Sequence, residues 1–166
     1  MRPITMQEVE MEAKSLQAGK SPGPDGFTTY LFHACWDTIK EEVHAIMEKS
    51  QQTKGILSAF NVAFLTLIPK GHCPSTLNKF RPIALCNVIY KIITKLIATR
   101  VKPLLPLLVS KEQTGYVEGR QILDGIILAH EVVHSLKLTK KPGMLMKLHM
   151  SKAFKRLNSS YIVRVL

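Results

Sequence analysis

The sequence has few cysteines, and none of them form a closely spaced pair. Cys35, Cys73 and Cys86 are its only cysteines in 166 residues. Disulfide-rich secreted domains and zinc fingers carry more cysteines at shorter spacing. A zinc site built from His33, Cys35, His72 and Cys73 is the alternative, but none of these ligands has finger-like spacing. We therefore expect reduced thiols and no bound metal.

Long apolar runs are also missing. The longest, such as Leu104 to Val109, are too short to cross a bilayer. Glu8, Glu10 and Glu12 occupy the region where a signal peptide would be apolar. These features predict a protein of the nucleus or cytoplasm, neither secreted nor associated with a membrane.

Acidic residues are scarce in most of the chain. Residues 1–50 hold five basic and eight acidic residues, whereas residues 51–166 hold eighteen basic and four acidic residues. No Asp or Glu follows Glu131, and the formal net charge is +11. The positive electrostatic field of such a chain favours binding to a polyanion, most simply nucleic acid. A basic surface that serves solubility is the alternative.

Hydrophobic residues make up 46% of the chain, enough for one domain with a core. A capping box at Thr5 and Glu8 begins the first predicted helix, and Asn87 caps a long helix with an apolar stripe from Val88 to Val101. Leu31, Ala34 and Cys35 are expected to form one apolar face. The patterns also predict helices over 6–18, over 28–50 with a break near Trp36, over 121–138 and from residue 159. Strands are predicted over 62–68, 80–85 and 144–150.

Two prolines and two glycines make the segment Lys20–Gly26 a rigid turn. It is not a phosphate-binding loop, because position 14 is Lys14 rather than glycine and Pro22 blocks the helix that must follow. A connector between helices is the plain interpretation.

The strands over 62–68 and 80–85 are predicted to form a hairpin, with Pro82 restricting the second strand to an edge or an end. The hairpin would present Lys70 and Arg81, and two fixed cations can clamp a phosphate. Exposed hairpins also carry such cations without any ligand, so both interpretations stand at this point.

The strand over 144–150 runs into a turn at Ser151, a place where folds often hold a reactive side chain on a stiff support. His149 occupies that place.

Five segments, taken together and in this order, resemble the reverse transcriptases of non-LTR retrotransposons, especially the long interspersed type of plants. They are Lys20–Gly26, Leu67–Lys70, Phe80–Lys91, Gln113–Arg120 and Leu128–Glu131. The resemblance implies an α+β fold, a truncated right-hand polymerase. Residues 1–142 would form helical fingers with a short β-hairpin, and residues 143–166 the first strand and helix of the palm.

The resemblance also assigns roles to basic residues of the fingers. Lys70 and Arg81 would hold the triphosphate of the incoming nucleotide. The backbone of the template or primer, RNA or DNA, would lie near Lys91, Lys95, Arg100 and Arg120. A template-facing role for residues 20–26 follows from the same comparison. The contacts with nucleic acid would be electrostatic, and no oligomeric state is indicated.

The position of a metal-binding aspartate is replaced in this chain. The family's palm strand carries an aspartate that binds two magnesium ions, which clamp the attacking and leaving oxygens. His149 stands there, and Lys155 stands where a second aspartate is usual. Magnesium prefers carboxylate oxygen, so neither residue is a suitable ligand.

The later palm motif with its paired aspartates lies beyond Leu166. We therefore expect a segment of a retrotransposon RNA-directed DNA polymerase that is inactive alone, with no catalytic residue and no metal site of its own. The alternatives are a non-catalytic, basic nucleic-acid-binding remnant and a product without a selected function.

Overall fold

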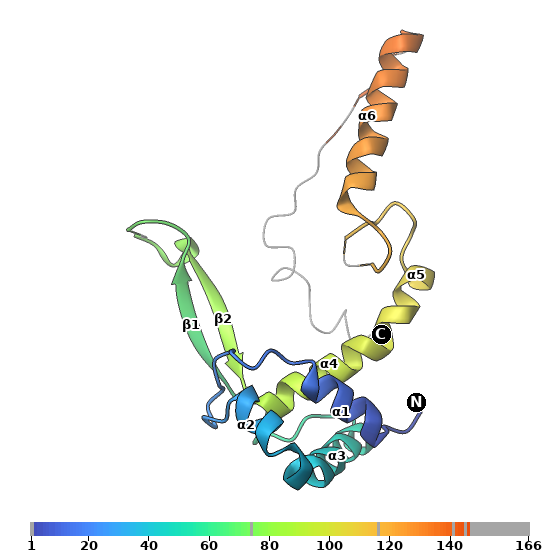
Figure 1. The fold of residues 1–166 in the computed structure, drawn as a ribbon. Helices are drawn as coiled ribbons and strands as arrows, with labels where there is room; N and C mark the ends of the chain where they lie inside the picture. Colours follow the sequence, from blue (N-terminus) through green and yellow to red (C-terminus); the bar gives the residue numbers. More distant parts are fainter. Residues whose placement is uncertain (1, 74, 116, 141, 145, 147–166) are drawn as a thin grey trace. The chain divides into compact units, whose positions relative to one another are not determined.

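The computed structural model describes residues 2–73, 75–115, 117–140, 142–144 and 146, and it divides the chain into two compact units, 1–111 and 112–166. Helices and one antiparallel hairpin make the fold α+β, as predicted (Figure 1). The division at residue 111 separates two parts of the chain that each make most of their contacts internally. The functional boundary between fingers and palm, at residue 142, stays a prediction.

Three helices begin the first unit. Helix α1 (Met6–Lys14) starts at the predicted capping box of Thr5 and Glu8. It ends four residues before the predicted residue 18, because Ser15 forms the C-cap and its hydroxyl donates to the carbonyl of Glu12. The predicted helix over 28–50 consists of α2 (Thr29–Ala34) and α3 (Trp36–Thr53), which meet at Cys35, next to the predicted break.

The core of the first unit lies among α1, α3 and α4 (Val88–Val101). The predicted apolar face of α2 was wrong: Leu31 and Ala34 are exposed, whereas the larger side chain of Phe32 is buried. Burial of the larger apolar surface stabilises the fold more. The buried apolar residues are Ile4, Val9, Ala13, Phe32, Trp36, Val43, Met47, Val88, Ile89, Ile92, Ile93 and Leu96.

The apolar stripe of α4 is buried only along part of the helix. The stripe residues up to Leu96 pack in the core, as predicted, but Ile97 is 50% exposed and Val101 is 37% exposed. The chain then continues through the short helices η2 (Lys102–Leu104) and α5 (Leu105–Leu108).

The predicted hairpin is confirmed. Strands β1 (Ala63–Pro69) and β2 (Phe80–Cys86) pair antiparallel, with the short helix η1 (Leu77–Lys79) just before β2. Neither strand contains a buried residue. Most contacts of each strand are with the other, so the hairpin extends beyond the helical core of the unit (Figure 1).

The second unit contains α6 (Ile122–Thr139). Each end of this helix lies one residue from the predicted end, at 121 or 138. Gln121 and Asp124 form a capping box at its start. The predicted strand over 144–150 is absent at Met144 and Met146, where no neighbouring strand in the described part of the unit offers hydrogen bonds. Its other residues, and the helix predicted from residue 159, lie outside the described residues.

The loop of residues 20–26 packs against the junction between β2 and α4. A Cβ atom on Gly23 would lie 2.3 Å from Oδ1 and 2.4 Å from the backbone N of Asn87. Asn87 is the N-cap residue of α4, yet its side chain makes no capping hydrogen bond and instead accepts one from the backbone N–H of Asp25 (3.3 Å). Lys91 donates to the carbonyl of Ser21 (3.1 Å). The loop is therefore held against the start of α4, and it connects α1 and α2 as predicted.

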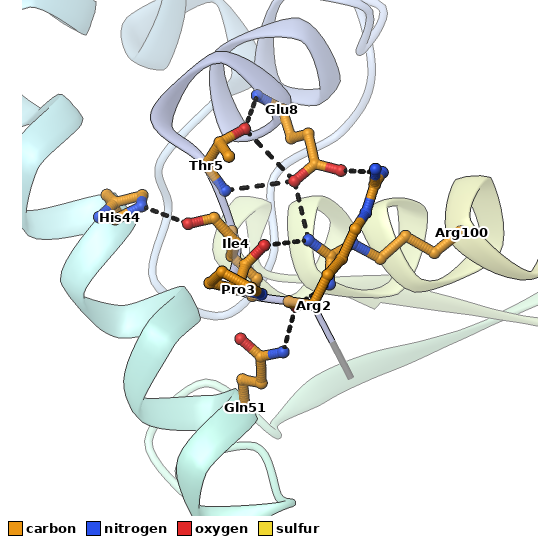
Figure 2. A network of polar contacts seen from close by, with 8 residues as sticks. All are labelled: Arg2, Pro3, Ile4, Thr5, Glu8, His44, Gln51 and Arg100. Atoms are coloured by element: carbon orange, nitrogen blue, oxygen red, sulfur yellow. Dashed lines mark hydrogen bonds and ion pairs between the residues drawn. The ribbon is translucent and has the colours of Figure 1, made fainter.

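A polar network holds the N-terminal segment on the helices (Figure 2). The guanidinium of Arg100 donates to the carbonyls of Arg2 and Pro3, both at 2.9 Å, and to Oε2 of Glu8 at 2.8 Å. Arg2 donates to the other oxygen of Glu8 at 2.6 Å. Helix α3 contributes His44, whose Nε2 donates to the carbonyl of Ile4 (3.0 Å).

The same network perturbs the acidity of Glu8. Its pKa falls from 4.5 to about 2, chiefly through the hydrogen bond from Arg100. Burial opposes the shift, while the N–H of Thr5 and the charges of Arg100 and Arg2 add to it. The side chains of Glu8 and Arg100 are only 19% and 14% exposed, so the pair is partly desolvated.

Gly23→Ala is expected to destabilise the first unit, because the new methyl group would displace the backbone at Asn87. We expect a loss of about 1–3 kcal/mol, typical of overpacking. Gly19→Ala is the matched control, since nothing lies within 4 Å of its Cβ position. Urea unfolding followed by circular dichroism measures both variants. Equal stability of the two would contradict the close packing of the loop.

Glu8→Gln is expected to destabilise the chain by roughly 1–3 kcal/mol at neutral pH, because it removes a charge-assisted bond from a partly buried arginine. The folded pKa of Glu8 lies below its ordinary value, so its contribution is complete above pH 4.5 and is lost as the pH falls towards 2.

The difference between parent and Glu8→Gln should therefore shrink across that window in urea unfolding. Glu10→Gln is the control, since Glu10 forms a surface ion pair with Lys14 and its substitution should change stability by less than about 1 kcal/mol. A difference between parent and Glu8→Gln that does not change from pH 7 to pH 2.5 would refute the role of the Glu8 carboxylate.

Candidate nucleotide-binding hairpin

The pairing of the hairpin puts its cations on one face. Arg81 pairs with Ile68, and Lys70 lies two residues beyond Ile68. The ladder continues to Lys70, whose N–H donates to the carbonyl of Lys79 (2.8 Å). Side chains two residues apart on a strand, and those directly opposite on its neighbour, share a face. Lys70 and Arg81 are therefore diagonal neighbours on the same face.

The tip of the hairpin forms an open hollow of about 180 Å³, lined by Lys70, Gly71, His72 and Lys79. Sequence reasoning did not single out Lys79. The signal that identifies it is the register of the hairpin, which places Lys79 across from Lys70. The tip thus gathers a third cation beside Lys70 and Arg81.

The three cations differ in how they are held. The amine of Lys70 donates to the carbonyl of Asn78 (3.0 Å), and that of Lys79 to the hydroxyl of Ser75 (3.3 Å). Arg81 is exposed, and its guanidinium has no hydrogen bond or ion pair within the described residues. Its guanidinium is therefore available to a ligand, and the two lysines keep donors to spare.

No carboxylate competes for these cations in the surrounding sequence. Residues 49–111 contain ten Lys or Arg residues and no Asp or Glu. Within this segment, Lys95 and Arg100 form ion pairs with acids of α1. An anion at the tip would therefore meet a uniformly positive environment.

The predicted nucleic-acid contacts of α4 are engaged within the fold. Lys95 donates to the carbonyl and the hydroxyl of Ser15, at 3.1 and 2.6 Å, and Lys91 donates to Ser21. Arg100 belongs to the network of Glu8. These side chains hold α4 against the loops and α1, and their contacts with nucleic acid stay predictions.

Arg120 lies in the second unit, where its guanidinium donates to the carbonyl of Gln113 (2.7 Å) and closes the loop before α6. Gly119 in the same loop has φ +76°, a conformation that favours glycine. Arg120 thus has a local structural contact, and its role toward a template or primer also stays a prediction.

The palm positions fall outside the described residues. These include His149 and Lys155, whose assignment to the family's aspartate positions stays a prediction. Within the described residues, no three His, Cys, Asp or Glu side chains group together suitably for a metal ion. The described residues therefore do not fit a pair of magnesium ions. Among the described helices, none combines the length and the apolar character that crossing a membrane requires.

Comparisons with known proteins identify the family. Residues 68–166 match the model for reverse transcriptase (RNA-dependent DNA polymerase), a range that includes Lys70 and Arg81. The chain is also 29% identical over 164 residues to the transposon TX1 uncharacterized 149 kDa protein of Xenopus laevis. The match covers 99% of this chain and 12% of that relative. The chain therefore belongs to the reverse transcriptase family, in agreement with its predicted resemblance to the enzymes of non-LTR retrotransposons.

Proposed function

We propose that this chain supplies the fingers, residues 1–142, and the start of the palm, residues 143–166, of a right-hand retrotransposon polymerase. In this proposal the hairpin binds the triphosphate of the incoming nucleotide. The observation that carries it is the placement of Lys70 and Arg81 as diagonal neighbours on one face of β1 and β2. The match to the reverse transcriptase family supplies the substrate class, because the family acts on nucleotides and nucleic-acid templates.

The two cations suit different tasks on a triphosphate. The planar guanidinium of Arg81 can donate two parallel hydrogen bonds to one phosphate group. The amine of Lys70 is a compact charge that can bridge phosphate oxygens. Such donors orient the reacting phosphate and stabilise negative charge that develops on the leaving group. Lys79, across from Lys70, adds a third positive charge at the tip.

We also propose that the chain alone does not catalyse nucleotide addition. The family in general uses divalent metal ions. Here the expected ligand positions hold His149 and Lys155, and no Asp or Glu follows Glu131. Imidazole suits zinc, copper or nickel rather than magnesium, and a lysine repels a cation. No catalytic step is therefore assigned to residues of this chain.

A second candidate function is binding of nucleic acid without catalysis. It is favoured by the eighteen basic and four acidic residues of 51–166. Such binding would be independent of sequence and would weaken steeply with salt, because displaced counterions drive it. Lys91, Lys95, Arg100 and Arg120 are the proposed backbone contacts. A product with no selected function is the remaining alternative.

Lys70→Ala and Arg81→Ala are expected to weaken binding of a deoxynucleoside triphosphate. Each removes one of the paired cations, and a charge-assisted hydrogen bond contributes about 1.5–3 kcal/mol, or roughly tenfold or more in affinity. Titration of the labelled chain with dTTP, followed by backbone amide NMR shifts, locates the site and gives the affinity.

Lys49→Ala is the matched control for that titration. It removes one positive charge from the exposed surface of α3, and no hydrogen bond or ion pair of its amine is seen within the described residues. We expect its affinity to equal that of the parent. Shifts spread evenly over the lysines of the chain, or an equal loss in all three variants, would contradict a clamp at the hairpin.

The purified chain is expected to add no nucleotide to a primed RNA template above the level of a mock preparation. It should still retain that template at low salt, with log affinity falling linearly as log salt rises. Primer extension and filter binding on one preparation measure both. Incorporation above the mock level would overturn the inactivity, and salt-independent binding would overturn the electrostatic contact.

A further inference from the structure

Helix α6 contains a pair of histidines to which the polymerase comparison assigns no role. The sequence His130-Glu131-Val132-Val133-His134 places two histidines four residues apart, with a glutamate after the first. All five residues lie within α6, Ile122–Thr139. On a helix, residues four apart are neighbours on one face, with Cβ atoms about 5–6 Å apart. His130 and His134 are thus brought together by the helix itself.

Both imidazoles face solvent. His130 and His134 are exposed, and neither imidazole has a hydrogen bond or an ion pair within the described residues. His33 and His44 contrast with them, because each donates to a backbone carbonyl in the first unit. The histidines of α6 are therefore not accounted for by the packing of the fold.

The same residue pattern serves as a zinc site in metallopeptidases, where the glutamate acts as a general base. That chemistry needs a third protein ligand and an enclosed substrate site. Within the described residues, no third His, Cys, Asp or Glu groups suitably with this pair. The whole motif also lies on an exposed stretch of helix, apart from a partly covered Val133. A hydrolytic function is therefore not inferred.

We propose that His130 and His134 form a two-imidazole surface site for a divalent transition metal ion, with zinc as the representative ion. Neutral imidazole nitrogen suits zinc, nickel and copper and is a poor ligand for magnesium. The site is separate from any magnesium chemistry of the polymerase, and it does not depend on the proposed function of the hairpin.

The neighbours of the pair favour a site of modest affinity. Glu131 precedes His134 by three residues, so its carboxylate lies beside the pair and adds negative charge. Lys137 follows His134 by three residues and opposes a bound cation. With two protein ligands, water completes the coordination of the ion.

The test is a titration of the full-length reduced chain with Zn²⁺, followed through the imidazole NMR signals of its six histidines. The signals of His130 and His134 are expected to shift together, with one shared affinity. His134→Ala should weaken zinc binding at His130 by about tenfold or more, because the second ligand acts at a high effective concentration. His72→Ala, a change in the hairpin, should leave this binding unchanged.

A second variant separates chelation from histidine content. Val132→His combined with His134→Ala keeps two histidines in α6 but places them two residues apart, where they do not face each other. It should bind zinc as weakly as His134→Ala, with the helix content unchanged by circular dichroism. Parent-like zinc affinity in either variant, or independent shifts of His130 and His134 in the parent, would overturn the proposal.

Discussion

The contact between Gly23 and Asn87 fixes how the parts of the first unit meet. Strand β2 ends at Cys86 and α4 begins at Val88, so Asn87 has no freedom to move without shifting both. The loop from α1 lies directly on this residue, close enough that a Cβ atom would collide with it. The side chain of Asn87 makes no capping hydrogen bond to α4, and its Oδ1 accepts a hydrogen bond from the N–H of Asp25 in the loop. This contact therefore lies at the root of the hairpin that carries Lys70 and Arg81.

The basic residues of the first unit fall into two groups with different tasks. Lys91, Lys95 and Arg100 donate to carbonyls far away in the sequence and thereby hold loops and the N-terminal segment against α4. The cations of the hairpin have at most local partners at the tip. Positive charge on α4 thus contributes to stability, whereas positive charge on the hairpin remains available to an anionic ligand.

Local signals in the sequence predicted much of this architecture. The capping box of Thr5, the β-branched and aromatic residues of 62–68 and the first part of the apolar stripe of α4, up to Leu96, each act within a few residues, and each was confirmed. The burial of Phe32 in place of Leu31, and the partners of Arg100, depend on residues distant in the sequence. The role of Lys79 required the register of the hairpin. These features follow from tertiary packing, which periodicity does not encode.

A two-stranded sheet has two open edges. The prolines of the hairpin leave these edges with different numbers of outward N–H donors for pairing with another strand. Lys70 and Lys79 form a hydrogen-bonded pair of the ladder. Because hydrogen-bonded and non-hydrogen-bonded pairs alternate along an antiparallel ladder, Pro69 and Pro82 fall in non-hydrogen-bonded pairs, and their backbone nitrogens face away from the partner strand. Pro82 therefore removes a donor from the middle of the β2 edge, whereas Pro69 removes one only at the end of β1. The β1 edge keeps its outward N–H groups at Leu65 and Leu67, residues that are 69% and 46% exposed. An added strand from another molecule would therefore pair more readily along β1 than along β2.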